Sequence, residues 1–78
     1  MRNNLAIGIM GAGAWGTTIA KLLSDKNSNV LLWAKEVQVK KDIEKTRINK
    51  NFLDKVKLNE SLKVTNSLED LSKLDVLF

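Results

Sequence analysis

Histidine and cysteine are both absent from this 78-residue chain. Their absence removes the commonest side-chain ligands of zinc and excludes a thiol nucleophile. A chain without cysteine fits any redox compartment, so this absence does not locate the protein. Long hydrophobic runs are also missing, because the apolar run near the N-terminus is far too short to cross a bilayer. We therefore predict no stable membrane insertion.

Aromatic residues are few, at 5%, and the net charge of +4 is carried almost entirely by lysine. Nucleic-acid binding usually requires a concentrated basic stripe, often with interleaved aromatic residues. Here the lysines are mixed with acidic residues, which predicts a solvated surface and no nucleic-acid partner. The second half of the chain contains Lys35, Lys40, Lys41, Lys45, Lys50, Lys55, Lys57 and Lys63.

The length and composition allow one small globular domain, since 44% of the residues are hydrophobic and 28% are charged. A complete doubly wound nucleotide-binding domain has two β-α-β-α-β halves, and this chain has room for little more than one. Residues 75–78 form a strand-like run with no turn after it, which predicts an interrupted element. A truncated gene, an early stop or a deliberately shortened polypeptide would each explain it.

A glycine-rich turn, G-A-G-A-W-G at residues 11–16, follows an apolar run over residues 5–10 and precedes a segment with helical periodicity. The G-x-G-x-x-G pattern alone is weak evidence, but between a strand and a helix it is the dinucleotide-binding fingerprint. Gly11 permits the tight turn, Gly13 lets a pyrophosphate approach the backbone, and Gly16 lets the helix pack near the strand. The free N–H groups and the positive end of the helix dipole then face the phosphates.

A secretory signal is the alternative for the N-terminus, because Arg2 precedes the apolar residues 5–14 and small residues follow. Glycine interrupts that run, however, and the amphipathic pattern continues beyond it. We therefore predict a cytoplasmic protein.

Strand and helix patterns alternate along the whole chain. Buried strands are predicted at residues 5–10, 30–34 and 74–78, and a short alternating strand at 62–65. The first helix begins at Ala14, and the second covers about 36–48 with Val39, Ile43 and either Arg47 or Ile48 facing inward. The inward face of the first helix is predicted to carry Trp15, Ile19, Leu22 and Leu23.

Two further segments complete the predicted order. Residues 49–60 form a loop in which Phe52, Leu53 and Val56 pack back onto the domain. A brief helix through Leu71 is capped by Asn66 or Ser67, since Ser67 stands three residues before Asp70.

The predicted fold is α/β, the N-terminal part of a Rossmann-type doubly wound parallel sheet with the order β-α-β-α-β-α-β, truncated after its fourth strand. Buried strands that alternate with helices predict a parallel sheet with right-handed crossovers. The expected spatial order of the strands is 3-2-1-4. The fourth strand would then be an exposed apolar edge.

The end of the second strand should decide which dinucleotide fits. An acidic residue there accepts hydrogen bonds from the adenosine ribose of NAD, whereas a basic residue pairs with the 2′-phosphate of NADP. Both signs are present, as Lys35 and Glu36. Glu36 has an alternative role, in which it only favours the N-terminus of the second helix. The preference between NAD and NADP stays open on this evidence.

The large aromatic residues have alternative roles as well. Helical spacing favours a core position for Trp15, although it sits within the phosphate turn and would there line the cofactor cleft. Trp33 is predicted to be core. Phe52 either covers the adenine or anchors the loop, and packing is favoured.

Three segments together resemble the N-terminus of NAD(P)-dependent glycerol-3-phosphate dehydrogenases: I-G-I-M-G-A-G-A-W-G-T-T at 7–18, V-L-L-W-A at 30–34 and N-F-L at 51–53. The tryptophan in the glycine turn makes the resemblance more specific than the glycines alone. Residues 65–70 and 75–77 also suit this family. The resemblance covers essentially the whole chain, but only about the first quarter of a full family member.

The resemblance implies a site for NAD or NADP and, for an intact member, interconversion of sn-glycerol 3-phosphate and dihydroxyacetone phosphate, which feeds phospholipid synthesis. It implies that residues 1–78 are a partial dinucleotide-binding domain without the substrate domain, so no lysine here matches a catalytic one. A full-length member would bind a small phosphorylated substrate and could form a homo-oligomer. The implied contacts to pyrophosphate and ribose are Gly11, Gly13, Ala14, Trp15 and Gly16, with Lys35 and Glu36 near the 2′ position and Phe52 near the adenine.

This chain departs from the family pattern at two places. NADP-using members often have arginine at the position of Glu36. Members usually follow the aromatic-Leu pair with Pro-Gly, whereas this chain has Asp54 and Lys55 and contains no proline. The resemblance places the family's catalytic lysines and glycerol-phosphate site beyond residue 78, so we expect a cofactor-binding fragment that is inactive alone. The alternatives are another NAD(P)-dependent dehydrogenase, a noncatalytic nucleotide-binding module or remnant, and, less favoured, a methyltransferase.

Overall fold

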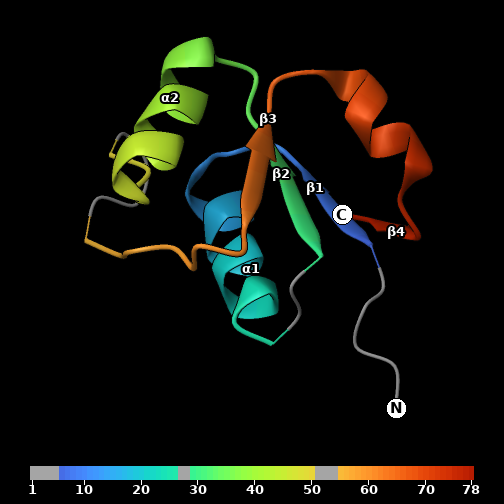
Figure 1. Cartoon of the computed structure of the whole chain (residues 1–78), viewed down its shortest axis with the longest axis horizontal. Helices are drawn as coiled ribbons and strands as arrows, with labels where there is room; N and C mark the ends of the chain where they lie inside the picture. Colours follow the sequence, from blue (N-terminus) through green and yellow to red (C-terminus); the bar gives the residue numbers. More distant parts are fainter. Residues whose placement is uncertain (1–5, 27–28, 51–54) are drawn as a thin grey trace.

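The computed structural model describes residues 6–26, 29–50 and 55–78 (Figure 1). Strands and helices alternate along the chain in the predicted order. No helix within these three ranges has the length and apolar character needed to cross a membrane. The elements are β1 (Ile7–Met10), α1 (Ala14–Ser24), β2 (Val30–Trp33), α2 (Val37–Thr46), β3 (Lys63–Thr65), the 3-10 helix η1 (Leu68–Lys73) and β4 (Val76–Leu77).

The four strands form one parallel sheet in the order β3-β2-β1-β4, as predicted. β1 pairs along its whole length with β2, so that Ile7 lies opposite Val30 and Met10 opposite Trp33. Because the strands are parallel, their carboxyl ends meet at one edge of the sheet. The glycine turn and the end of β2 therefore lie next to each other.

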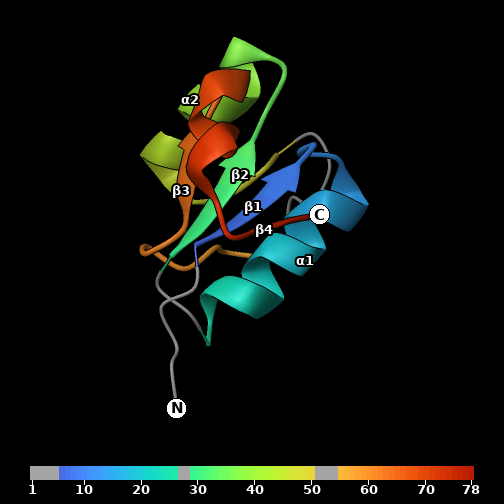
Figure 2. The ribbon, with the colours of Figure 1, turned by 90° about the vertical axis from the view of Figure 1, so that its right-hand side faces the viewer.

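The two faces of the sheet are covered unequally. α1 and α2 lie on one face, and η1 lies on the other, as the two perpendicular views show (Figures 1 and 2). The main core lies between the sheet and the two α-helices. Its buried side chains are Ile7, Ile9, Ala12, Ala20, Val30, Leu32, Ala34, Val39, Ile43, Leu58, Leu62 and Val64.

The predicted inward face of α1 is confirmed for Ile19 and Leu23, which pack against the core, and wrong for Trp15 and Leu22. Trp15 is 77% exposed and Leu22 59% exposed, whereas the buried residues of α1 are Thr17, Ala20 and Ser24. At the start of α1 the helix lies so close to the turn after β1 that a Cβ at Gly16 would not fit. The spacing of large apolar residues therefore identified the helix and placed Ile19 and Leu23 correctly, but it assigned Trp15 and Leu22 to the core wrongly.

The inward face of α2 is confirmed, since Val39 and Ile43 are both buried. Element ends differ from the predictions by at most two residues where the structure describes them, and β4 is shorter than expected. Phe52 and Leu53 lie outside the described residues. Leu58, which was not singled out, joins the core and donates its backbone N–H to the Arg47 carbonyl at 2.7 Å.

The predicted side-chain cap before η1 is also wrong. Ser67 is the N-cap residue, but its side chain makes no capping hydrogen bond. Thr65 at the end of β3 links the two residues instead: its hydroxyl donates to the Asp70 carboxylate and accepts the Ser67 N–H at 3.1 Å. A partner two residues before the cap satisfies these groups, which local spacing did not indicate.

Candidate functional site

The glycine turn leaves β1 in a conformation that favours glycine. Gly11 has a φ of 125°, a region that L side chains rarely adopt. Its N–H donates to the Trp33 carbonyl at 3.0 Å, which fastens the turn to the end of β2. The predicted role of Gly11 in the tight turn is confirmed.

Gly16 brings α1 against the turn. A Cβ added at this residue would lie 2.0 Å from the Gly11 carbonyl oxygen and 3.5 Å from a methyl group of Ile9. No side chain fits at the first distance. The predicted close approach of helix and strand is therefore confirmed.

The N-terminus of α1 is open to an anion. Gly13 is its N-cap residue, so no side chain caps the helix, and the first turn contains no acidic residue. The first N–H groups of a helix have no partner within the helix. A Cβ added at Gly13 would meet nothing within 4 Å, so a ligand can approach the backbone there.

A cleft of about 170 Å³ extends from this turn to the start of α2. Its walls come from the glycine turn, the end of β2 and the first turn of α2. Lys35 and Glu36 are exposed at its rim, and Glu36 is also the N-cap residue of α2. The lining residues are Gly11, Ala12, Gly13, Ala34, Lys35, Glu36 and Val39.

The family model for the NAD-dependent glycerol-3-phosphate dehydrogenase N-terminus matches residues 6–78. The chain belongs to this family. Among curated relatives, a glycerol-3-phosphate dehydrogenase [NAD(P)+] of Geobacter sulfurreducens is 47% identical over 82% of this chain and 19% of its own length. The glycerol-3-phosphate dehydrogenase [NAD(P)+] of Novosphingobium aromaticivorans is 42% identical over 91% of this chain and 22% of its own length. The chain thus spans about a fifth of these relatives.

Solved structures agree with this assignment. Glycerol-3-phosphate dehydrogenase of Coxiella burnetii has a TM-score of 0.79 and 30% identity over 88% of this chain and 21% of that chain. The fold is also that of the Plasmodium falciparum enzyme, with a TM-score of 0.83 at 24% identity over 96% of this chain and 24% of that one. The Rossmann-type fold expected from the sequence is confirmed.

The structure brings together four of the site residues predicted for this family member, namely Gly11, Gly13, Lys35 and Glu36. Gly16 lies behind the turn in its packing role. Ala14 and Trp15 are exposed in the first turn of α1 but do not line the cleft. Phe52 lies outside the described residues.

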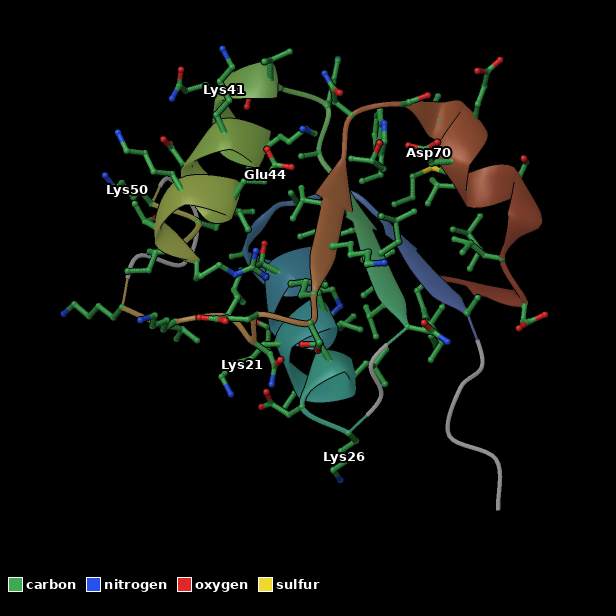
Figure 3. All side chains as sticks on the ribbon, in the orientation of Figure 1. Lys21, Lys26, Lys41, Glu44, Lys50 and Asp70 are labelled. Carbon is green, nitrogen blue, oxygen red and sulfur yellow. The ribbon has the colours of Figure 1, made fainter. Side chains whose placement is uncertain are left out.

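The lysines lie on different sides of the molecule. Lys41 lies on α2 and Lys50 follows that helix, whereas Lys21 lies in the last turn of α1 and Lys26 just after it (Figure 3). Within the described ranges, Lys21 forms an ion pair with Asp25 at 2.8 Å and Lys40 one with Glu44 at 3.0 Å, each to a residue one helical turn away. The hydrogen bond from Lys21 holds the pKa of Asp25 below its ordinary value.

Two residues of the site were missed from the sequence. Thr17 and Asn49 are buried directly behind the glycine turn, and both form hydrogen bonds to the Ala12 carbonyl. Thr17 stands within the quoted motif, but Asn49 falls in the predicted loop after α2. An asparagine in a loop has no periodicity that would reveal its burial.

Proposed function

We propose that this chain binds the ADP portion of NAD or NADP and forms the cofactor-binding part of a glycerol-3-phosphate dehydrogenase. The observation that carries the proposal is the uncapped N-terminus of α1 behind Gly13, which faces the cleft toward Lys35 and Glu36. Membership of the family supports the same ligand class. Residues 1–78 then form a partial dinucleotide-binding domain, and the substrate-binding part lies outside them.

The two ends of the cleft suit the pyrophosphate and the adenosine ribose of such a ligand. Backbone N–H groups at Gly13 and the first turn of α1 would hold the pyrophosphate, because the helix dipole is positive there. The rim at Lys35 and Glu36 would face the adenosine ribose. Trp15, which is exposed in the same turn, would lie beside the bound phosphates.

When bound, the dinucleotide would supply the hydride chemistry by which an intact dehydrogenase interconverts sn-glycerol 3-phosphate and dihydroxyacetone phosphate. This chain orients the cofactor through its adenosine half. It supplies no proposed catalytic residue. We place the protein in the cytoplasm and its product in phospholipid synthesis.

Titration of the chain with NADH and NADPH tests the binding step, with tryptophan fluorescence as the signal since Trp15 adjoins the turn. We expect saturable quenching by at least one dinucleotide. Nicotinamide mononucleotide, which lacks the AMP half and so has neither the adenosine nor the pyrophosphate, is the control and should not compete. No saturable change, in a chain whose far-UV circular dichroism shows folded α/β structure, would contradict the proposal.

A chimera tests the reaction. Residues 6–78 would replace the matching segment of the Geobacter sulfurreducens relative, and oxidation of NADH would be followed with and without dihydroxyacetone phosphate. Substrate-dependent oxidation supports a dehydrogenase cofactor domain. Dinucleotide binding without turnover would instead favour a noncatalytic module.

A further inference from the structure

We infer that Asn49 is a positioning residue for the glycine turn: its carboxamide holds the Ala12 carbonyl on the protein side and thereby points the Gly13 N–H toward the cleft. The inference rests on the proposed function, since the Gly13 N–H matters only if an anion binds there. It concerns a residue beyond the glycine pattern.

The chain reaches this position by a sharp reversal after α2. The helix ends at Thr46, and Arg47 adopts a left-handed conformation with a φ of 62°. The Ile48 N–H donates to the Thr46 hydroxyl at 3.2 Å, which stabilises the reversal. Asn49 follows at once and is only 1% exposed, although it lies in a loop.

The donors of the Asn49 carboxamide are both used. Its Nδ2 donates to the Ala12 carbonyl at 2.7 Å and to the Thr17 hydroxyl at 2.8 Å. Thr17 Oγ1 in turn donates to the same Ala12 carbonyl at 3.3 Å. The two amide hydrogens of Asn49 and the hydroxyl hydrogen of Thr17 therefore account for all three bonds. Both side chains donate to the Ala12 carbonyl oxygen.

The oxygen of the Asn49 carboxamide indicates that the side chain acts here as a hydrogen-bond donor. Asn49 Oδ1 is buried and has no hydrogen-bond partner among the described residues. Reversal of the amide would place that oxygen against the Ala12 carbonyl, where two acceptors would repel. An unpaired buried oxygen costs free energy, so packing alone does not explain an asparagine here.

The geometry of the peptide between Ala12 and Gly13 links the direction of the Ala12 carbonyl to that of the Gly13 N–H. In a planar trans peptide, the C=O of one residue and the N–H of the next point in opposite directions. The described residues contain no cis peptide. With the Ala12 carbonyl held toward Asn49 and Thr17, the Gly13 N–H points away from them, on the side where Gly13 lines the cleft.

The test is an ADP titration of the isotopically labelled chain, followed by amide chemical shifts. In the native chain we expect the Gly13 amide signal to move as ADP saturates. Asn49→Leu removes the donor without adding charge, and Thr17→Val removes the hydroxyl. Each should weaken ADP binding about tenfold, the equivalent of one charge-assisted hydrogen bond. The Gly13 shift at saturation should shrink, while shifts at Lys35 and Glu36 persist.

Thr17→Ser is the matched control, because it trims the buried side chain but keeps the hydroxyl, and its ADP affinity should stay within about twofold of native. If Asn49→Leu and Thr17→Val fold and keep the native ADP affinity and the native Gly13 shift, the inference is overturned while the proposed function stands. Failure of the native chain to bind ADP would overturn the proposed function and the inference with it.

A measurement on the native chain covers the case in which the variants do not fold. The Asn49 side-chain amide protons should exchange slowly with solvent and show nuclear Overhauser contacts to Thr17. Exchange at the rate of a free asparagine side chain would overturn the inference.

Discussion

In the glycine turn, different residues are needed for folding and for ligand binding. Gly16 is needed for space, since an added Cβ would meet the Gly11 carbonyl oxygen at 2.0 Å. A Cβ added at Gly13 would meet no atom within 4 Å, and the φ of −72° at this residue suits any amino acid. Two glycines three residues apart thus serve different purposes.

Gly16→Ala should destabilise the chain, because overpacking against a backbone atom costs about 1–3 kcal/mol or more. Gly13→Ala should leave the free energy of unfolding within about 1 kcal/mol of native but weaken NADH binding at least tenfold. Urea unfolding and fluorescence titration measure the two quantities. A Gly16→Ala chain as stable as native would contradict the packing argument.

Glu36 should disfavour the 2′-phosphate of NADP, since it is exposed at the cleft rim and negatively charged. We expect Glu36→Gln to raise the affinity for NADPH relative to NADH by about three- to tenfold. Glu44→Gln makes the same charge change farther along α2 and should leave the ratio unchanged. An equal effect of both variants would point to net charge alone.

At the scale of elements, the reversal after α2 links three parts of the molecule. The Arg47 guanidinium donates to the Leu62 carbonyl at 2.6 Å and also to the Asn59 carbonyl. These bonds fasten the segment before β3 to the end of α2. The same reversal delivers Asn49 to the glycine turn.

Arg47→Ala should lower the free energy of unfolding by about 1–3 kcal/mol, because two carbonyls lose a charged donor. Arg47→Lys keeps the charge but not the forked geometry, so it should recover less than half of the loss. Lys45→Ala in the last turn of α2 is the control, and it should change stability by less than about 0.5 kcal/mol. Equal stability of all three variants in urea would refute this role.

At the scale of the whole molecule, the sheet is covered well on one face and sparsely on the other. The main core lies under α1 and α2, whereas Met10, Leu77 and Phe78 are each more than half exposed near the β1–β4 edge. A small domain with an exposed apolar edge has limited stability. Ligand binding should therefore have a visible effect on folding.

Saturating dinucleotide should raise the midpoint of thermal unfolding. A ligand at a hundred times its Kd stabilises the folded state by about 2.7 kcal/mol, which corresponds to about 10 °C or more for a domain of this size. Circular dichroism melts with NADH and with nicotinamide mononucleotide would measure the difference. Equal midpoints would indicate that the folded chain does not bind the ADP portion.

Local sequence patterns determined the order of the elements, because the buried strands and the glycine turn are specified by neighbours along the chain. Val39 and Ile43 were placed correctly for the same reason. The parallel sheet and its strand order followed from the fold class that this alternation indicates. Ile19 and Leu23 were placed correctly on α1, but Trp15 and Leu22 were not, since the rotation of α1 about its axis against the sheet is a property of the assembled fold. Only the tertiary structure placed Asn49 beside Ala12, which lies 37 residues earlier in the chain. A contact of that range depends on the path of α2 and its reversal at Arg47, and no local pattern encodes it.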